Sequence, residues 1–164
     1  MIVLTVGTQL PFDRLVQMVD ELAPLMSEPV FAQTGQGQYE PRNICWSASM
    51  PPGEFEAMLR DASVIIAHAG IGTVLKAYKY GKPIVLVPRQ AAYGEHRNDH
   101  QLATVAKLGE RRGIYVAQQK EELAGILTRS LEPVSLNEAE CNGRQRLVDF
   151  LNRQAREALG GARL

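Results

Sequence analysis

Cysteine is scarce in this sequence, long apolar runs are missing, and neither sign of charge is in excess. The two cysteines, Cys45 and Cys141, lie far apart and match no metal-binding spacing, so we expect two reduced and mostly buried thiols in a cytoplasmic protein. No apolar run reaches the roughly 18 residues that a membrane-spanning helix requires. The 18 Lys and Arg residues balance the 18 Asp and Glu residues, which argues against nucleic acid as the main partner.

The sequence does contain apolar residues in the proportion of an ordinary globular domain. Hydrophobic residues make up 45% of the 164 positions, which is enough for the core of one domain spanning residues 1–164. The segment from Met1 to Val6 carries neither a basic leader nor a cleavage site, and we interpret it as a first strand.

Short apolar runs alternate with segments whose apolar residues recur at helical spacing. The predicted strands are Ile2 to Val6, Pro29 to Gln33, Asn43 to Ser47, Val64 to Ala67, Pro83 to Pro88 and Ile114 to Val116. The predicted helices are Phe12 to Leu25, one starting at Pro51, Val74 to Gly81, His100 to Leu108, Lys120 to Leu131, and an amphipathic helix over 136–159. Because most strands are apolar throughout, the pattern predicts an α/β fold with a doubly wound, Rossmann-like parallel sheet. Ligands bind such sheets beyond the carboxyl ends of the strands.

The stretch from His68 to Thr73 is the first candidate site, because it joins a buried strand to a helix through Gly70 and Gly72. The first amides of a helix lack intrahelical partners and attract anions, and glycine lets a ligand approach the backbone. The motif lacks the third glycine of the dinucleotide fingerprint, since Leu75 stands there, and it lacks the lysine of a phosphate-binding loop. On this motif alone, an anion site and simple packing of the turn both stay open.

Two further polar stretches follow predicted strands. Gly94 to Gln101 is polar throughout, and it is either a solvated loop or a source of hydrogen bonds to a ribose and a sugar. His96 and His100 are four residues apart and suit a zinc pair, but the sequence places no third ligand. The other stretch, Thr5 to Asp13, runs through Gly7 and Thr8 into a helix and could face the same ligand.

Taken in order, these motifs resemble a known family. They are His68-Ala69-Gly70-x-Gly72-Thr73, Gly81-Lys82-Pro83, Val87-Pro88-Arg89 and Glu95-His96-x-Asn98-Asp99-His100-Gln101. The series, over Ile2 to Leu108, resembles the carboxy-terminal half of family 28 glycosyltransferases. The opening Val6-Gly7-Thr8 with Phe12-Asp13 is similar to the small one-domain members, which are donor-binding subunits of two-part transferases of the Alg13 and bacterial exopolysaccharide PssE type.

The resemblance implies that this chain is the sugar-donor half of a GT-B glycosyltransferase. It implies an inverting hexosyl transfer from a UDP-sugar, without a required metal or cofactor, in exopolysaccharide or glycolipid synthesis. The acceptor would be a lipid-linked sugar, held by a separate membrane-associated partner of the Alg14 or PssD type. The chain itself would be cytoplasmic, with no membrane span, and recruited to the inner face of the membrane by that partner.

The resemblance also implies roles for individual residues. Gly7, Thr8, Gly70, Gly72 and Thr73 would line the diphosphate, while Glu95, Asp99 and Gln101 would reach the ribose or the donor sugar. From its position after a strand, Arg89 could add a positive charge to the diphosphate. His68 is the candidate base for the acceptor hydroxyl; alternatively it braces the turn, and the partner supplies the base.

One position departs from the family pattern. Several relatives carry a Glu that grips the ribose where this chain has Lys76, and a lysine accepts no hydrogen bond from a hydroxyl. Either Glu95 takes over the ribose, or the nucleotide sits differently. Two other functions stay open: a non-catalytic nucleotide-binding or regulatory module, and a Rossmann-type oxidoreductase subunit, which the missing fingerprint disfavours.

Overall fold

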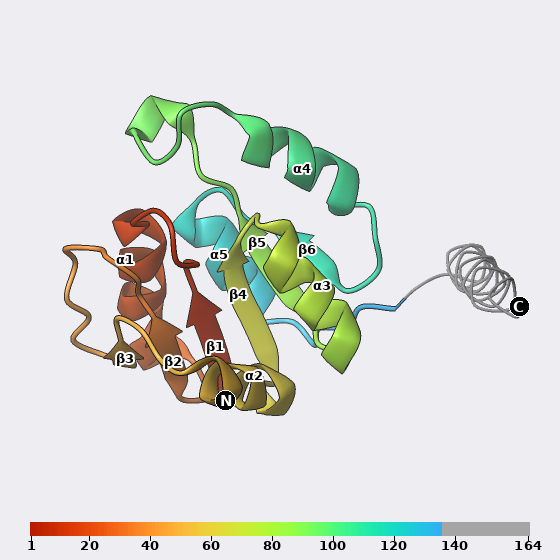
Figure 1. Cartoon of the computed structure of the whole chain (residues 1–164). Coiled ribbons are helices and arrows are strands. Elements are labelled where there is room, and N and C mark those ends of the chain that lie inside the picture. The colour runs from red at the N-terminus through yellow and green to blue at the C-terminus, as the bar shows by residue number, and fades with distance from the viewer. Residues whose placement is uncertain (136–164) are drawn as a thin grey trace, which may run out of the picture. The chain divides into compact units, whose positions relative to one another are not determined.

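Six parallel strands form one twisted sheet within residues 1–135, the part of the chain that the computed structural model describes (Figure 1). The sheet order is β3-β2-β1-β4-β5-β6. Strands β1 to β3 extend the sheet toward one edge and strands β4 to β6 toward the other, so the topological switch point lies between β1 and β4. The strands are β1 Ile2–Thr5, β2 Val30–Gln33, β3 Cys45–Ser47, β4 Val64–His68, β5 Ile84–Val87 and β6 Ile114–Val116.

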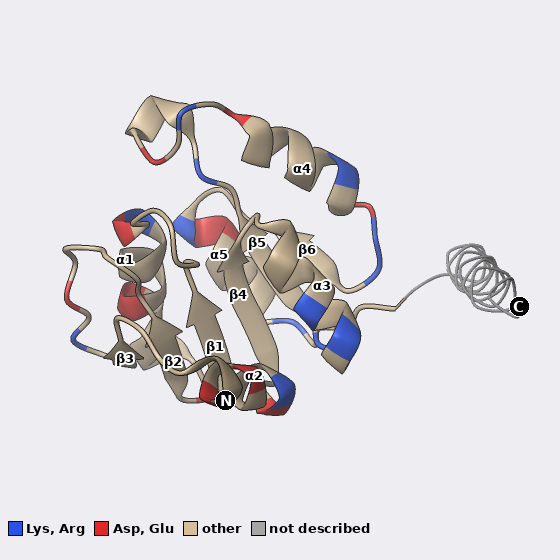
Figure 2. Cartoon of the chain, viewed as in Figure 1, with Lys and Arg blue, Asp and Glu red and all other residues tan. Residues whose placement is uncertain are grey.

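The helices that connect the strands cover both faces of the sheet. They are α1 Asp13–Leu22, α2 Pro52–Asp61, α3 Ile71–Tyr80, α4 His100–Leu108 and α5 Lys120–Leu127, with short 3-10 helices η1 Ala23–Leu25 and η2 Ala91–Tyr93. One core cluster packs α1 and α5 on the sheet, and a second packs α2, α3 and α4 on the other face. None of the six strands in residues 1–135 carries a charged residue, so charge in this part of the chain lies in the helices and loops (Figure 2), as burial on both faces requires.

The predicted fold class is confirmed, and most predicted elements lie within two residues of the observed ones. The helix predicted from Lys120 is shorter than expected: α5 ends at Leu127 rather than Leu131. The Thr128 hydroxyl bonds the carbonyl of Gly125, and such local bonds compete with continuation of a helix. The expectation of a buried Cys45 is wrong, because β3 is the edge strand and leaves that thiol exposed. The predicted helix at 136–159 and Cys141 lie outside the described residues.

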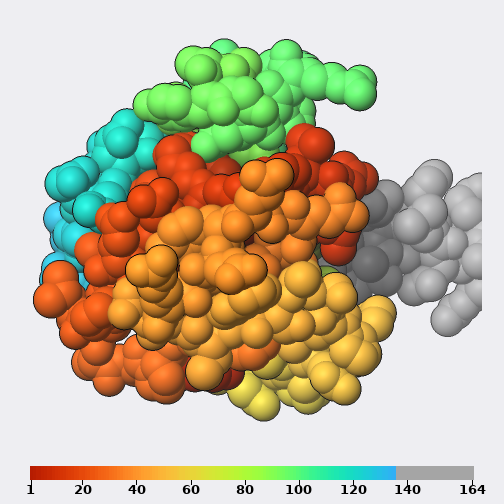
Figure 3. All heavy atoms as spheres, turned by 90° about the vertical axis from the view of Figure 1, so that its left-hand side faces the viewer, coloured from red at the N-terminus to blue at the C-terminus, as the bar shows by residue number. Residues whose placement is uncertain are grey.

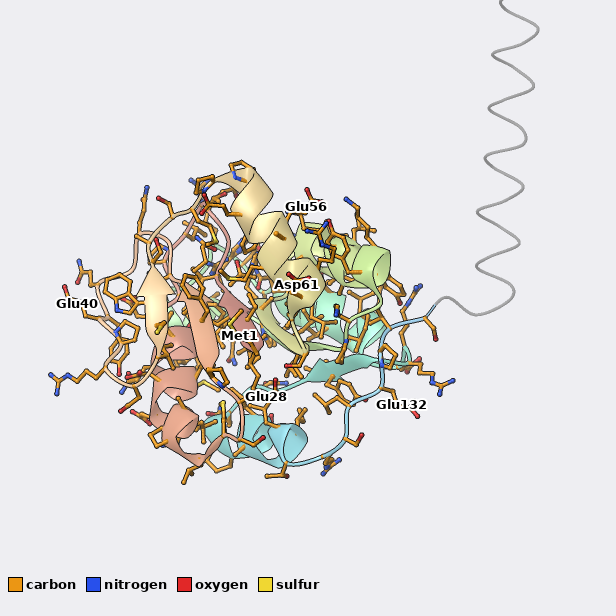
Figure 4. The ribbon with its side chains drawn as sticks, turned by 90° about the horizontal axis from the view of Figure 1, so that it is seen from below. Met1, Glu28, Glu40, Glu56, Asp61 and Glu132 are labelled. Carbon is orange, nitrogen blue, oxygen red and sulfur yellow. The ribbon has the colours of Figure 1, made fainter. Side chains whose placement is uncertain are left out.

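The loops that follow β1, β4 and β5 meet at one edge of the sheet, as predicted for a parallel arrangement. The segment that contains η2 and α4, green in Figure 3, lies over the red N-terminal segment that contains the loop after β1. Figure 4 shows the opposite, amino edge, where Met1, Glu28 and Asp61 lie close to the starts of β1, β2 and β4. The chain therefore concentrates its predicted site residues at the carboxyl edge only.

The buried carboxylate of Asp20 in α1 anchors the chain between β2 and β3. Asp20 is 1% exposed and accepts hydrogen bonds from the amides of Arg42 and Asn43 and from the Tyr39 hydroxyl, at 2.7–3.1 Å. Burial raises the pKa of this carboxyl, but these hydrogen bonds outweigh burial and hold the pKa below its ordinary value.

Asp20→Asn is expected to lower the free energy of unfolding at pH 7 by about 2–3 kcal/mol, because each hydrogen bond to a charged acceptor contributes roughly 1.5–3 kcal/mol. A carboxyl with a depressed pKa stabilises the fold above its unfolded-state pKa and loses that contribution as the pH falls. The difference between the two proteins, measured by urea unfolding, is therefore expected to narrow from about pH 5 toward pH 3. Asp61→Asn is the control, since that carboxyl is 76% exposed. A difference that is independent of pH would contradict the assignment.

Candidate functional site

A cavity of about 220 Å³ lies at the switch point, between the ends of β1 and β4 and the segment after β5. Its lining consists of Val6, Gly7, Thr8, Gln9, Leu10, His68, Gly70, Gly72, Thr73, Arg89, His96 and Gln101. The structure thus brings eight of the ten predicted site residues together, and leaves Glu95 and Asp99 outside the lining. Two larger cavities, of about 560 and 650 Å³, contain none of the predicted residues.

The N-terminus of α3 opens into this cavity. Gly70 is the cap residue, and no side chain caps the helix, so the first amides of α3 are available to a ligand. The amide of Thr73 turns back to the Gly70 carbonyl at 3.2 Å, whereas the amide of Gly72 has no such backbone partner among the described residues. A side chain added at Gly72 would meet nothing within 4 Å, which means that the fold itself does not require glycine there.

His68 ends β4 and packs between the two glycine turns. A Cβ atom at Gly7 would lie 2.7 Å from Cε1 of His68, and one at Gly70 would overlap the same ring. Gly7 also has a positive φ of 80°, a conformation that side-chain-bearing residues rarely adopt. Both glycines are therefore needed for the close approach of the β1 and β4 loops to the imidazole.

The electrostatic environment keeps His68 neutral. Burial, together with the positive charge of Arg89, lowers the pKa of His68 to about 4, although the backbone of Thr5 acts in the opposite direction. Its Nδ1 is buried and has no hydrogen-bond partner among the described residues. An anion bound in the cavity would oppose this shift, since a nearby negative charge favours the protonated imidazole.

Arg89 is the buried cation of the site. The residue is 4% exposed, and its Nη2 donates to the carbonyl of Val6 at 2.9 Å and of Leu10 at 2.6 Å, while its guanidinium lies over the Phe12 ring. Its Nε has no hydrogen-bond partner within the described part of the chain. Burial lowers the pKa of Arg89 and the charge of Glu95 opposes that effect, but a guanidinium stays protonated at neutral pH. Arg89 thus both braces the loop after β1 and places a positive charge at the cavity wall.

Gln101, in the first turn of α4, joins the ends of two strands. Its Oε1 accepts the amide of Ala69 at 3.2 Å and the amide of Arg89 at 3.0 Å. Because these two backbone donors occupy the oxygen, the amide group has its two N–H donors left for a ligand.

Glu95 and Asp99, in the segment between β5 and α4, are already engaged by other groups of the protein. Glu95 forms a bidentate ion pair with Arg14, at 2.6 and 2.9 Å, and accepts the amide of Gln90 at 2.9 Å. Asp99 accepts the amide of Ala91 at 2.9 Å. Much of the polarity of this segment therefore serves its own conformation, which the sequence pattern alone did not indicate.

The structure also gives the positions of Lys76 and His96 relative to the cavity. Lys76 points to α2, with its Nζ 4.9 Å from the centre of the Phe55 ring, and it does not line the cavity. His96 does line the cavity, which we did not predict, and its Nδ1 lies 3.1 Å from both oxygens of Asn98. Within residues 1–135 no group of three or more His, Cys, Asp or Glu side chains is arranged to hold a metal ion.

The charge of the cavity has one sign. Its lining contains the Arg89 guanidinium, a helix N-terminus, two threonines and two histidines, and no Asp or Glu among the described residues. The unpaired amides and the cation favour a negatively charged ligand. The arrangement is that of a small anion site at the switch point of a parallel sheet.

The profile of the glycosyltransferase family 28 C-terminal domain matches residues 1–152. The chain belongs to this family. The region that matches family 28 includes both the glycine turn after β4 and the segment between β5 and α4. No curated protein matches the sequence at a significant level.

Solved glycosyltransferase structures share the fold of this family 28 domain. MurG of Acinetobacter baumannii is 25% identical with a TM-score of 0.51, and the match covers 77% of this chain and 40% of MurG. The calicheamicin glycosyltransferase CalG4 is 17% identical with a TM-score of 0.55, covering 98% of this chain and 41% of CalG4. The glycotransferase of kitacinnamycin is 18% identical with a TM-score of 0.57, covering 79% and 34%. The match thus spans about a third to two fifths of these proteins, and the fold is that of GT-B carboxy-terminal domains.

None of the helices in residues 1–135 is both long and apolar enough to cross a bilayer.

Proposed function

We propose that this chain binds the sugar donor, a UDP-sugar, for a glycosyltransferase whose acceptor site is on another chain. The observation that carries the proposal is the switch-point cavity, where the open N-terminus of α3 and the buried Arg89 guanidinium meet with no carboxylate in the described lining. A departing nucleoside diphosphate gains negative charge during transfer, and fixed amides and a cation in a poorly hydrated cleft stabilise that charge.

The glycine and threonine residues fit the diphosphate part of such a donor. Gly7, Gly70 and Gly72 let the phosphates approach the backbone, and Thr8 and Thr73 offer hydroxyls at the wall of the cavity. Gln101 offers N–H donors to a sugar hydroxyl, because backbone amides already occupy its oxygen.

Transfer also requires a base for the acceptor hydroxyl. His68 and His96 are the histidines of the described lining, which contains no carboxylate. A His68 pKa of about 4 makes the free imidazole a weak base, but a bound diphosphate would raise that pKa toward its ordinary value. We therefore keep His68 as the candidate base in the donor complex.

The described residues correspond to one part of such an enzyme, since the match covers 34–41% of the length of the three glycosyltransferases compared above. We propose a membrane-associated partner that holds a lipid-linked acceptor and recruits this chain to the membrane surface. The transfer would be an inverting, metal-independent hexosyl transfer in exopolysaccharide or glycolipid synthesis.

A matched pair of tryptophan variants tests the binding site. Gly72 is the second residue of α3 and Gly53 the second residue of α2, and an added Cβ meets nothing within 4 Å at either position. Gly72→Trp is expected to weaken UDP binding at least about tenfold, since the indole would fill the cavity mouth, while Gly53→Trp leaves it unchanged. Isothermal titration calorimetry with UDP, and with NAD as the negative ligand, measures both.

The outcomes of this titration separate the candidate functions. Equal UDP affinity in both variants would show that the diphosphate does not bind at α3. Binding of NAD but not UDP would favour the alternative of a Rossmann-type oxidoreductase subunit. UDP binding without any sugar transfer, even with the membrane fraction of the source cells present, would favour a non-catalytic nucleotide-binding module.

A further inference from the structure

The Arg14 side chain binds two other segments of the chain beside the site, although it does not line the cavity. It lies in the first turn of α1, where its Nε and Nη2 bind the two carboxylate oxygens of Glu95. Its Nη2 also donates to the carbonyl of Pro88 at 3.1 Å, and its Nη1 to the carbonyl of Gln118 at 2.9 Å. Arg14 therefore ties α1 to the chain after β5 and to the chain after β6.

The ion pair of Arg14 with Glu95 is largely shielded from water. The side chains of Arg14 and Glu95 are 21% and 10% exposed, and the guanidinium lies 5.0 Å from the centre of the Tyr93 ring in η2. A bidentate guanidinium–carboxylate pair has a defined geometry, unlike a single exposed ion pair. Such a pair can fix the position of the segment that carries it.

Glu95 connects Arg14 to the part of the chain that contains a cavity residue. Its Oε2 accepts the amide of Gln90, which closes the turn from Gln90 to Glu95 around η2. The next residue, His96, lines the cavity, while both carboxylate oxygens of Glu95 are already engaged. A carboxylate with both oxygens engaged in this way has less capacity left for the hydroxyls of a ribose.

We propose that Arg14 and Glu95 are a positioning pair, which holds residues 90–96 against α1 and thereby keeps His96 on the wall of the nucleotide site without touching the nucleotide. This assigns Glu95 a role different from ribose recognition. The inference rests on the proposed function, because it takes UDP as the ligand of the cavity.

A double-mutant cycle with two nucleotides tests the pair. The proteins are wild type, Arg14→Met, Glu95→Met and the double variant, and the ligands are UDP and its 2′,3′-dideoxy analogue, each titrated by calorimetry. We expect each single change to weaken both ligands by the same factor, on the order of tenfold, and the double change to be no worse than the more harmful single one. Loss of affinity for UDP alone in Glu95→Met would overturn the inference, since it would mean that Glu95 contacts the ribose hydroxyls. Fully additive losses would overturn it as well.

A milder variant covers the case in which the methionine proteins fail to fold. Arg14→Lys keeps the charge but loses the bidentate geometry, and its folding is checked by its melting temperature. The chain has three histidines, so their ring signals can be separated by NMR and assigned with His96→Gln. We expect Arg14→Lys to move the His96 signal and to remove its response to UDP, while the His68 signal keeps its response. An unchanged His96 response would overturn the inference. Absence of UDP binding to wild type would instead reject the proposed function, and this inference with it.

Discussion

Gly70→Ala is expected to lower the free energy of unfolding by about 1–3 kcal/mol, the usual cost of overpacking a well-packed region. The added methyl group would overlap the imidazole of His68, and this ring cannot retreat freely because it also lies against Gly7. The backbone at Gly70 has φ of −90° and ψ of 129°, which alanine adopts without strain, so backbone strain does not add to the loss. Chemical denaturation of the two proteins measures the difference.

Two companion variants make the prediction specific. Gly72→Ala, two residues along the chain, is expected to be neutral or slightly stabilising, because its Cβ meets nothing and alanine favours a helix. His68→Ala in the Gly70→Ala background is expected to recover most of the lost stability, since it removes the colliding ring. If the double variant is as unstable as the sum of the single ones, the packing of His68 between the glycine turns is not the cause.

The sheet could be predicted from the sequence because its signals are local and strong. The run Ile84 to Val87 is apolar and mostly β-branched with proline on both sides, and α3 ends where Gly81 adopts the left-handed conformation. Each of these features acts within a few residues, so no knowledge of tertiary contacts was needed. The gathering of Gly7, His68 and Arg89 then followed from the rule that parallel strands end at one edge.

The roles within the segment after β5 could not be predicted in the same way. Glu95 is engaged by Arg14, which lies 81 positions away in the chain, and Gln101 receives the amide of Ala69, 32 positions away. A carboxylate that binds a ribose and one that binds a guanidinium look the same in a sequence. His96 was weighed only as a metal ligand, because its spacing to His100 suggested zinc. Position in the fold, and not residue type, distinguishes these roles.

Arg89→Met is expected to have the largest effect on both stability and binding. The change leaves the carbonyls of Val6 and Leu10 without their hydrogen-bond donor, and an unsatisfied buried polar group costs roughly 1–3 kcal/mol. The loop after β1 carries Gly7 and Thr8, so its release disorders one wall of the cavity. Removal of the one buried cation of the described lining also weakens attraction to a diphosphate, and we expect UDP affinity to fall on the order of a hundredfold. Denaturation and calorimetry on the same variant measure the two effects.

Arg89→Lys separates the two roles of the guanidinium. An ammonium group restores the positive charge, but the lysine side chain ends one atom short of the Nη2 position from which Arg89 donates to both carbonyls. This variant should therefore regain part of the UDP affinity and little of the stability. Arg112→Met is the control, because Arg112 pairs on the surface with Glu132 and its side chain is 69% exposed; loss of such a pair changes stability by at most about 1 kcal/mol. If Arg89→Lys recovers stability and affinity in equal measure, the charge alone matters, and the hydrogen bonds to Val6 and Leu10 are not what holds the cavity wall in place.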